Sequence, residues 1–325
     1  MINKLINDLY KVLDGKAITF EEALRASEIT GGDILDLVSL ANKVKNKYAN
    51  SVEICTIMNT KSGACEQNCK YCSQSKHHST SVEVYPLADM STVLSDAEKT
   101  WKSGVKTFGL VTSGWGYSEV NDEFKLILDM IDAIYKKFPE MRVCGSFGIL
   151  SEETVRELKK HRVFEYNHNL QVVPDKYKDL VATTHTIEQR INTVKLLKKN
   201  GIKVCSGGII GLGETMEDRI KMAFALNELD ADVIPLNVLI PIKGTPLEDA
   251  KPVSVADITK TFALFRLINP TKTIKFAAGR ETRMKDYQAL LMLSGANGFL
   301  TGGYLTTRGR TPDEDFNFTE ELSKF

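Results

Sequence analysis

Three cysteines lie close together in the chain, at Cys65, Cys69 and Cys72, and form the pattern C-x3-C-x2-C. Thiolates at this spacing let a single loop hold three corners of an iron–sulfur cube. A structural zinc site or a ferredoxin cluster needs a fourth ligand, which nearby only His77 or His78 could supply. Without that ligand one iron stays open to a substrate. The pattern therefore predicts a catalytic cluster, with a structural zinc site as the competing interpretation.

The composition indicates the cellular compartment in which the six cysteines are expected to lie. The 325 residues are 42% hydrophobic, and 42 Lys and Arg balance 42 Asp and Glu, so the formal net charge is zero. This balance provides no positive field for nucleic acid or an anionic membrane surface, and no apolar stretch is long enough to span a bilayer. Residues 1–14 lack the apolar run of a secretory signal, so we expect a cytoplasmic protein with reduced thiols. Metal binding or catalysis is then expected of the cysteines before disulfide formation.

The elements that must position these residues alternate between short β-branched runs and amphipathic helical segments. Eight such units in about 250 residues predict an α/β fold, a (β/α)8 TIM barrel. A doubly wound sheet with fewer strands is the alternative. In a barrel, the chemistry lies at the C-terminal ends of the strands and in the loops that follow them. The predicted strands begin near Val52, Val105, Met141, Val163, Ile202, Asp232, Thr273 and Gly298, of which the last is the weakest.

A helical segment precedes the first predicted strand. Apolar residues recur at helical spacing over residues 2–48, and Thr19 before Glu21 and Glu22 is typical of an N-cap followed by an acidic first turn. No linker rich in Pro, Gly or Ser divides the sequence. We expect an N-terminal helical extension over residues 1–50 and a barrel with a C-terminal tail over residues 51–325.

The cysteine loop resembles the motif of the radical S-adenosylmethionine (SAM) superfamily, C-x3-C-x-aromatic-C, with Tyr71 at the aromatic position beside the adenine. The most specific further stretch is YNHNL at residues 166–170, which resembles the biotin synthase family. The resemblance implies a radical SAM barrel that binds a [4Fe–4S] cluster and SAM and inserts sulfur into dethiobiotin to form biotin. Other stretches that carry it are residues 61–65, 202–208, 211–215, 243–247, 278–281 and 304–307.

The same resemblance implies how the substrate is held. Asn167 and Asn237 would bind the ureido ring of dethiobiotin, since an amide side chain offers both a donor and an acceptor to a cyclic urea. Thr306 and Thr307 would hold the carboxylate at the end of the substrate's tail.

SAM would be held by residues from several strand ends. By resemblance, Asn169 bonds the SAM ribose and Arg190 lies near the SAM carboxylate as a permanent cation. Thr112 and Ser113 belong to a second-strand loop that lines the SAM site. At Gln171 the family usually carries an acidic residue for the ribose, and because glutamine can still bond hydroxyls we expect an altered but working site.

A second cluster is where the chain departs from the family. Biotin synthases carry an auxiliary cluster deep in the barrel, usually held by three strand cysteines and an arginine, as the source of the inserted sulfur. Two of these positions are Cys144 and Cys205 here, but Gly109 and Lys275 replace the third cysteine and the arginine. Cys55 stands where the family commonly has serine. Because alternate strands contribute to one layer of a barrel, Cys55, Cys144, Cys205 and Lys275 are expected to form such a layer and to ligate the cluster.

The composition of this auxiliary cluster depends on its ligands. Three thiolates suit a cube with one iron free to carry an extra sulfide, so a four-iron cluster is preferred over a [2Fe–2S] cluster. Gly109 is expected to leave room for the larger cluster. Lys275 could ligate as a neutral amine, which desolvation would favour, or donate hydrogen bonds to a sulfide.

Two other interpretations of the chain remain open at this point. One is a related radical SAM enzyme, such as a methylornithine synthase or a hydrogenase-cofactor maturase, and the other is a non-catalytic iron–sulfur or zinc protein that carries electrons. The preferred interpretation, a biotin synthase, implies a flavodoxin- or ferredoxin-type reductant and a homodimer.

Overall fold

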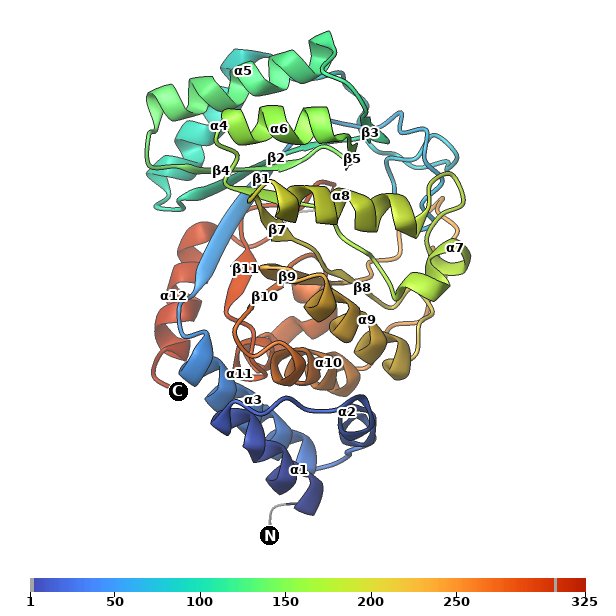
Figure 1. The fold of residues 1–325 in the computed structure, drawn as a ribbon, viewed down its shortest axis with the longest axis vertical. Coiled ribbons are helices and arrows are strands. Elements are labelled where there is room, and N and C mark those ends of the chain that lie inside the picture. The colour runs from blue at the N-terminus through green and yellow to red at the C-terminus, as the bar shows by residue number, and fades with distance from the viewer. Residues whose placement is uncertain (1–2, 307–308) are drawn as a thin grey trace.

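The computed structural model describes residues 3–306 and 309–325, and these residues form a closed barrel of parallel strands (Figure 1). In order around the ring the strands are β1 (Glu53–Lys61), β2 (Thr107–Thr112), β4 (Arg142–Ser146), β6 (Glu165–Asn167), β7 (Lys203–Cys205), β9 (Val233–Val238), β10 (Thr273–Phe276) and β11 (Gly298–Leu300). The ring closes because β10 pairs with both β9 and β11, and β11 pairs with β1. The expected (β/α)8 barrel is confirmed, including its weakest strand, and the open doubly wound sheet is wrong.

Helices cover the outside of the barrel. Each of the longer ones begins at a side-chain oxygen that accepts a hydrogen bond from the first turn, which satisfies one of the free N–H groups there. The caps are Asp89, Asn121, Ser151, Thr186, Thr215 and Ser254. They begin α4 (Met90–Lys102), α5 (Asp122–Lys137), α6 (Glu152–Lys160), α8 (Ile187–Lys199), α9 (Met216–Glu228) and α10 (Val255–Ile268) in that order. The short α11 (Ala289–Leu293) completes this layer.

The remaining elements lie at the C-terminal ends of the strands and at the end of the chain. They are β3 (Gly116–Tyr117), which pairs with β5 (Ile149–Leu150), β8 (Gly208–Ile210), which pairs with β9, η2 (Pro174–Lys176), α7 (Tyr177–Leu180), η3 (Arg280–Met284), η4 (Lys285–Tyr287) and α12 (Pro312–Leu322). None of the described helices is long and apolar enough to cross a membrane.

The helices before β1 pack beneath one side of the barrel (Figure 1). They are α1 (Lys4–Leu9), η1 (Tyr10–Asp14), α2 (Phe20–Ser27) and α3 (Asp33–Tyr48). Thr19 and Glu22 form a reciprocal capping box at the start of α2, as the sequence predicts for an N-cap. Apolar residues of α1–α3 share one hydrophobic core with α9 and α10, and Lys260 donates a 2.8 Å hydrogen bond to Ser27 O. The helical extension is therefore joined to the barrel by a continuous core.

Inside the barrel, the pleat of each strand decides which residues face the interior. Cys55 and Ile57 on β1, and Cys144 and Ser146 on β4, line one central cavity. Thr56, between the first two, also borders it, but its hydroxyl lies 3.0 Å from Thr100 Oγ1 on α4, outside the barrel. Lys275 lines the same cavity from β10. The sequence therefore places a polar layer in an interior that branched apolar residues usually fill.

Candidate active site

The loop that carries Cys65, Cys69 and Cys72 follows β1 directly and is folded back on itself. Cys65 N donates to Gln74 O at 3.0 Å, and Lys76 N donates to Cys65 O at 2.8 Å. Cys72 N donates to Cys69 O at 3.0 Å, which closes a tight turn between two of the thiols. These local hydrogen bonds bring the three thiols to one wall of a shared cavity.

Gly63 joins this loop to the end of β2. Its φ of 71° lies in the left-handed region, and a Cβ there would lie 2.6 Å from Val84 Cγ2, so glycine is required. Its N–H donates to Gln74 Oε1 at 3.0 Å, and its carbonyl accepts a hydrogen bond from Ser113 Oγ at 2.8 Å. The Ser113 hydroxyl is thus used to hold the cysteine loop in place.

The thiols of Cys69 and Cys72 keep their protons unless iron displaces them. Burial and the neighbouring thiol of Cys72 raise the pKa of Cys69 to about 12, and burial raises the pKa of Cys72 to about 11. No three His, Cys, Asp or Glu side chains of the described residues gather tightly enough around one point to hold a single metal ion. His77 Nε2 lies 3.0 Å from Glu66 O, and His78 Nε2 lies 3.0 Å from Cys69 O. This geometry suits a cube, which takes each thiolate at a different iron, better than a tetrahedral zinc site.

A cavity of about 170 Å³ next to the loop collects every residue that the sequence assigns to the first cluster and to SAM. Two of its polar atoms, Thr112 Oγ1 and Gln171 Oε1, are buried without a hydrogen-bond partner among the described residues, so they are free to bond a ligand. Gln171 also has a φ of 75°, an uncommon conformation for a residue with a side chain. The residues brought together are Cys65, Cys69, Tyr71, Cys72, Thr112, Ser113, Asn169, Gln171 and Arg190.

Asn169 and Arg190 are fixed by backbone contacts. Arg190 Nε donates to Asn169 O at 2.6 Å, and Asn169 Oδ1 accepts from Gly207 N at 3.0 Å. The oxygen of the Asn169 amide is therefore engaged, and its NH2 group is the part that can reach a ligand.

His185 also lines this cavity, and sequence reasoning missed it. Its ring nitrogens lie 2.7 Å from Tyr177 Oη, 3.0 Å from Gln67 Oε1 and 3.4 Å from Arg190 Nη1. Burial and the charge of Arg190 lower the pKa of His185 to about 4, so the ring is neutral near pH 7. Its partner Gln67 is 118 residues away in the sequence, so no local pattern could reveal this contact.

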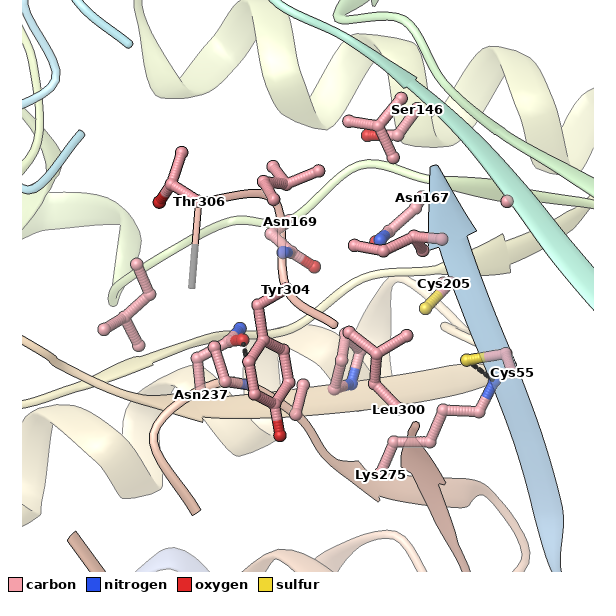
Figure 2. A pocket seen from close by; sticks show the side chains of 18 of the residues that line it. Cys55, Ser146, Asn167, Asn169, Cys205, Asn237, Lys275, Leu300, Tyr304 and Thr306 are labelled. Carbon is pink, nitrogen blue, oxygen red and sulfur yellow. Dashed lines mark hydrogen bonds between the residues drawn. The ribbon is translucent and has the colours of Figure 1, made fainter. Parts of the chain in front are cut away.

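A second cavity, of about 360 Å³, adjoins the first and runs down into the barrel (Figure 2). The two share several lining residues, among them Tyr71, Cys72, Asn167 and Gln171. Within the described part of the chain, Asn167 Oδ1 is buried without a hydrogen-bond partner and is available to a donor in this space. The shared wall means that a molecule in one cavity lies beside a molecule in the other.

The other residues assigned to the substrate differ in how many of their hydrogen-bonding groups are already used within the protein. Asn237 Oδ1 accepts from Ala278 N at 3.1 Å, and its Nδ2 donates to Gly208 O at 3.2 Å, which leaves one N–H and one lone pair. Thr306 lines the second cavity, and its Oγ1 accepts from Ser73 Oγ at 3.4 Å. Thr307 lies outside the described residues.

The floor of the second cavity is the predicted layer of strand cysteines. Cys55, Cys144 and Cys205 line it together with Lys275, whose Nζ lies 3.8 Å from Cys55 Sγ (Figure 2). Burial raises the pKa of all three thiols, so each would keep its proton without a metal. A Cβ at Gly109 would lie 3.0 Å from Ile57 Cγ2, 3.5 Å from Thr56 O and 3.9 Å from Cys144 Cβ, so its tight contact would be with Ile57.

Four charged residues that sequence reasoning did not consider as a group close the barrel below this layer. Glu53, Lys203, Glu165 and Lys275 form what we call the charge ring, in which each lysine contacts both glutamates. Burial lowers the pKa of Lys275, but the acidic side chains around it, among them the Glu165 carboxylate, outweigh burial and hold that pKa well above its usual value. Desolvation does favour a neutral Lys275, as expected, but the neighbouring acids outweigh it and stabilise the ammonium.

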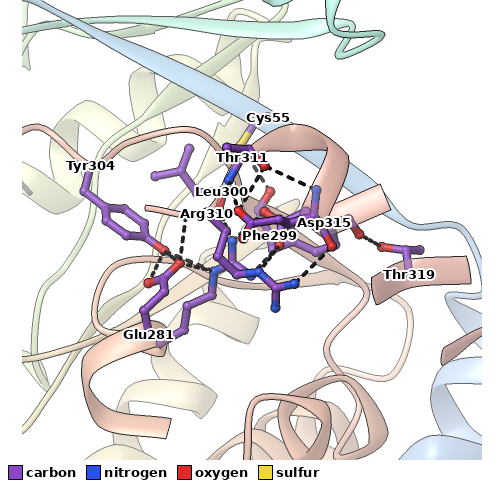
Figure 3. A network of polar contacts seen from close by, with 11 residues as sticks. Cys55, Glu281, Phe299, Leu300, Tyr304, Arg310, Thr311, Asp315 and Thr319 are labelled. Atoms are coloured by element: carbon purple, nitrogen blue, oxygen red, sulfur yellow. Dashed lines mark hydrogen bonds and ion pairs between the residues drawn. The ribbon is translucent and has the colours of Figure 1, made fainter. Parts of the chain in front are cut away.

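A buried polar network holds the C-terminal segment against the barrel (Figure 3). Arg280, which follows β10, donates to Asp315 Oδ1 at 2.9 Å and to Asp315 Oδ2 at 2.6 Å. Tyr304 Oη accepts from Arg280 Nε at 3.1 Å and donates to Glu281 Oε2 at 2.9 Å. Since Tyr304 lines the second cavity, this network also fixes the wall next to Thr306.

Comparison with known proteins agrees with this geometry. Residues 59–226 match the model of the Radical SAM superfamily, and residues 235–323 match the Biotin and Thiamin Synthesis associated domain. Among solved structures, methylornithine synthase aligns with a TM-score of 0.85 at 17% identity, covering 98% of this chain and 96% of its own. The hydrogenase maturase HydG from Carboxydothermus hydrogenoformans aligns with a TM-score of 0.81 at 19% identity, covering 99% and 78%. At these identities the likeness concerns the fold alone.

Curated relatives are much more similar in sequence. The biotin synthase of Pelodictyon phaeoclathratiforme is 55% identical over 97% of this chain and 96% of its own length. That of Chlorobaculum tepidum is 53% identical over 98% and 97%. With the two matching domains and the two adjoining cavities, these identities show that the chain belongs to the biotin synthase family of radical SAM enzymes.

Proposed function

We propose that this protein inserts sulfur into dethiobiotin to form biotin, with SAM as the source of the radical. The observation that carries the proposal is the shared wall between two cavities, one lined by the Cys65–Cys72 loop and one by three strand cysteines. When bound, the first cluster supplies the electron that releases a 5′-deoxyadenosyl radical from SAM, and the second supplies the sulfur. The protein's own residues hold the reactants side by side and exclude water.

The first cluster would be held by Cys65, Cys69 and Cys72. All three thiols line one cavity, and no fourth protein thiol lies on the same loop, which leaves one corner for the amino and carboxylate groups of SAM. Tyr71, between two of the cysteines, lines the same cavity and would lie beside the adenine.

SAM would occupy the remainder of the first cavity. Thr112 Oγ1 and Gln171 Oε1, the two buried oxygens described above, would bond polar groups of SAM, with Gln171 and the Asn169 amide nitrogen at the ribose hydroxyls. Arg190 would face the SAM carboxylate as a permanent cation, while Ser113 supports the wall.

Dethiobiotin would lie in the second cavity with its ureido ring at Asn167. The buried Asn167 Oδ1 suits a ring N–H, and the remaining N–H of Asn237 suits the ring carbonyl. Thr306, and Thr307 by its place in the sequence, would take the tail carboxylate at the opposite end. This orientation would put the carbons that receive sulfur above the strand cysteines.

The auxiliary cluster would be a four-iron cube held by Cys55, Cys144 and Cys205. Their side chains face one space from three strands, and Lys275 lies at its edge. With only three thiolates, one iron would remain without a cysteine ligand, whereas a two-iron cluster usually needs four protein ligands. Lys275, as an ammonium between two carboxylates, would donate hydrogen bonds to cluster sulfur in preference to ligating iron.

The reaction also determines which partners the protein needs. Cleaving SAM requires one electron from outside the protein, and a flavodoxin- or ferredoxin-type protein of the cytosol is the proposed donor. A homodimer is the proposed assembly, as the family resemblance implies.

Anaerobic turnover tests the proposal. Reduced protein with SAM and dethiobiotin should yield 5′-deoxyadenosine and biotin, both measured by mass spectrometry. Deoxyadenosine without biotin would favour another radical SAM reaction, and neither product would indicate a non-catalytic iron–sulfur protein. Titanium citrate or dithionite can replace the natural reductant, so that a missing partner protein does not decide the result.

A further inference from the structure

His185 stands between the cysteine loop and Arg190, and its contacts determine which ring nitrogen carries the proton. Arg190 Nη1 lies 3.4 Å from His185 Nε2 and can only donate, so Nε2 is the acceptor. The proton of the neutral ring is then on Nδ1, which lies 3.0 Å from Gln67 Oε1 and donates to it. Burial and the charge of Arg190 lower the pKa of His185 to about 4, in agreement with this neutral form.

Tyr177 holds the ring of His185 in place. Its Oη lies 2.7 Å from His185 Nε2, and burial raises the pKa of Tyr177 to about 12, so the hydroxyl keeps its proton and donates it. The two rings also meet edge to face, with their centroids 5.7 Å apart. His185 is 5% exposed, so these contacts keep its lone pair directed toward Tyr177 and Arg190.

Arg190 is held through two of its three nitrogen atoms. Its Nε donates to Asn169 O at 2.6 Å, and its Nη1 donates to His185 Nε2. Asn169 follows β6, whereas His185 precedes α8, the helix that carries Arg190. Because a guanidinium is planar, two fixed nitrogens determine the orientation of the whole group. Since Arg190 lines the first cavity, these two contacts decide how its charge is presented to a ligand there.

We propose that His185 is a positioning residue that orients Arg190 toward the carboxylate of SAM and so makes the cavity select ligands that carry this group; the inference rests on the proposed SAM site. Without the acceptor on His185, Arg190 would keep its contact with Asn169 O and could turn about it. The carboxylate would then lose a charge-assisted hydrogen bond of fixed geometry. The adenosine part of the ligand would keep its own partners.

A purely structural His185 would act on the cysteine loop instead, because Gln67 belongs to that loop. Thr183 provides the matched control, since it joins the same loop to the same segment. Its Oγ1 accepts from Asn68 Nδ2 at 2.7 Å, and its N–H donates to Asn68 Oδ1 at 3.0 Å. Among the described residues Thr183 has no hydrogen bond to Arg190, so Thr183→Ala weakens the support of the loop and leaves the guanidinium as it is.

The test compares SAM with decarboxylated SAM, which lacks only the carboxylate, on the full chain with its clusters assembled anaerobically. Isothermal titration gives the Kd of each ligand, and iron analysis gives the cluster content of each variant. His185→Phe keeps a ring but removes both nitrogens. It should weaken SAM binding about tenfold and change the affinity for decarboxylated SAM less than about twofold, with the iron content unchanged.

Two further variants show which contact is responsible. His185→Gln has a side-chain oxygen that can accept from Arg190, so it should recover part of the affinity for SAM. Thr183→Ala should leave both affinities within about twofold of the parent. No recovery in His185→Gln would mean that the acceptor is not what matters, and a loss of SAM affinity in Thr183→Ala as large as that in His185→Phe would assign the effect to the loop. Either result would refute the positioning role.

The comparison of the two ligands separates this inference from the proposed function. If the parent prefers SAM and His185→Phe keeps that preference in full, the positioning role is refuted while the SAM site stands. Equal weakening of both ligands, or a loss of iron in His185→Phe, would refute it in the same way. A parent that binds SAM no more tightly than decarboxylated SAM would overturn the proposed placement of SAM, and the role of His185 with it.

Discussion

The cysteine loop and the strand cysteines hold their thiols in two different ways. Cys65, Cys69 and Cys72 lie within one loop, and backbone hydrogen bonds of that same loop set their spacing. Cys55 and Cys205 lie on β1 and β7, and only the closed barrel brings them together. A loop of this kind fixes its ligands by sequence spacing, whereas a barrel layer offers equivalent positions around a ring. A ligand can therefore move from one strand to its neighbour and still face the same space.

If the strand cysteines hold the proposed auxiliary cluster, this difference accounts for the departure from the usual ligand pattern that the family resemblance implies. Gly109 on β2 cannot ligate, but Ile57 and Gly109 are register partners, so β1 lies directly beside that position. Cys55, one inward position earlier on β1, still lines the cavity that Cys144 reaches from the other side of β2. The layer therefore holds three thiols, one of them on β1 beside the β2 position to which the resemblance assigns a cysteine.

Removing an iron ligand from the cysteine loop should have the largest effect on activity. Cys69→Ala removes one of three iron ligands from a loop with no spare thiol, so SAM cleavage should be lost completely while the fold is kept. 5′-Deoxyadenosine formation with dithionite and SAM measures this, and circular dichroism checks the fold. The auxiliary cluster should persist at about four irons per chain. Normal deoxyadenosine formation would overturn the assignment of the loop.

Removing a thiol from the layer of strand cysteines should stop biotin formation without stopping SAM cleavage. Cys55→Ser should destroy the auxiliary cluster and abolish biotin formation, because one of three thiolates is lost. SAM cleavage should continue, since the Cys65–Cys72 loop is untouched. Measuring biotin and 5′-deoxyadenosine in the same anaerobic reaction gives the amount of biotin formed per SAM cleaved. Biotin formation at the parent rate would return Cys55 to the role of a buried structural residue.

A smaller effect is expected from a residue that contacts dethiobiotin and not SAM or a cluster. Asn167→Leu leaves ureido groups of dethiobiotin unpaired, at roughly 1–3 kcal/mol for each group. Dethiobiotin binding should weaken about tenfold or more, while SAM binding stays near the parent value. Isothermal titration of each ligand under anaerobic conditions tests both. An unchanged affinity for dethiobiotin would mean that the substrate does not lie at the end of β6.

Lys275→Ala should have the smallest effect of the four. If Lys275 only donates hydrogen bonds to cluster sulfur, its loss should reduce biotin formation and leave the iron content close to that of the parent. Cys55→Ser in parallel provides the comparison. An iron loss as large as that caused by Cys55→Ser would make Lys275 a ligand of the cluster.

Features that depend on residues close together in the sequence can be predicted from it, and features that depend on distant residues cannot. The eight strands and the Cys65–Cys72 loop follow from local periodicity and spacing, and the layer of Cys55, Cys144 and Cys205 follows once a barrel is assumed. Glu165 and His185 were missed because their partners lie far away in the sequence and only the closed ring brings them near.

The charge on Lys275 shows a second limit. From the sequence, its burial is foreseeable but its neighbours are not, so desolvation alone predicted a neutral amine. In the barrel, Lys275 Nζ lies 3.8 Å from Glu53 and 3.7 Å from Glu165, and these carboxylates stabilise the ammonium. Whether a buried lysine is protonated depends on the side chains that contact it. Strand register decides which side chains these are, and the residue pattern of a short strand does not determine the register.

The central claim is that two separately ligated clusters face each other across adjoining cavities, the second held by Cys55, Cys144 and Cys205. Anaerobic iron and sulfide counting with Mössbauer spectroscopy tests it most directly, on the chain with Cys65, Cys69 and Cys72 changed to Ala. We expect about four irons per chain in that variant, about eight in the intact protein, and loss of the remaining cluster when Cys55→Ser is added. A stable two-iron cluster that survives Cys55→Ser would contradict the claim.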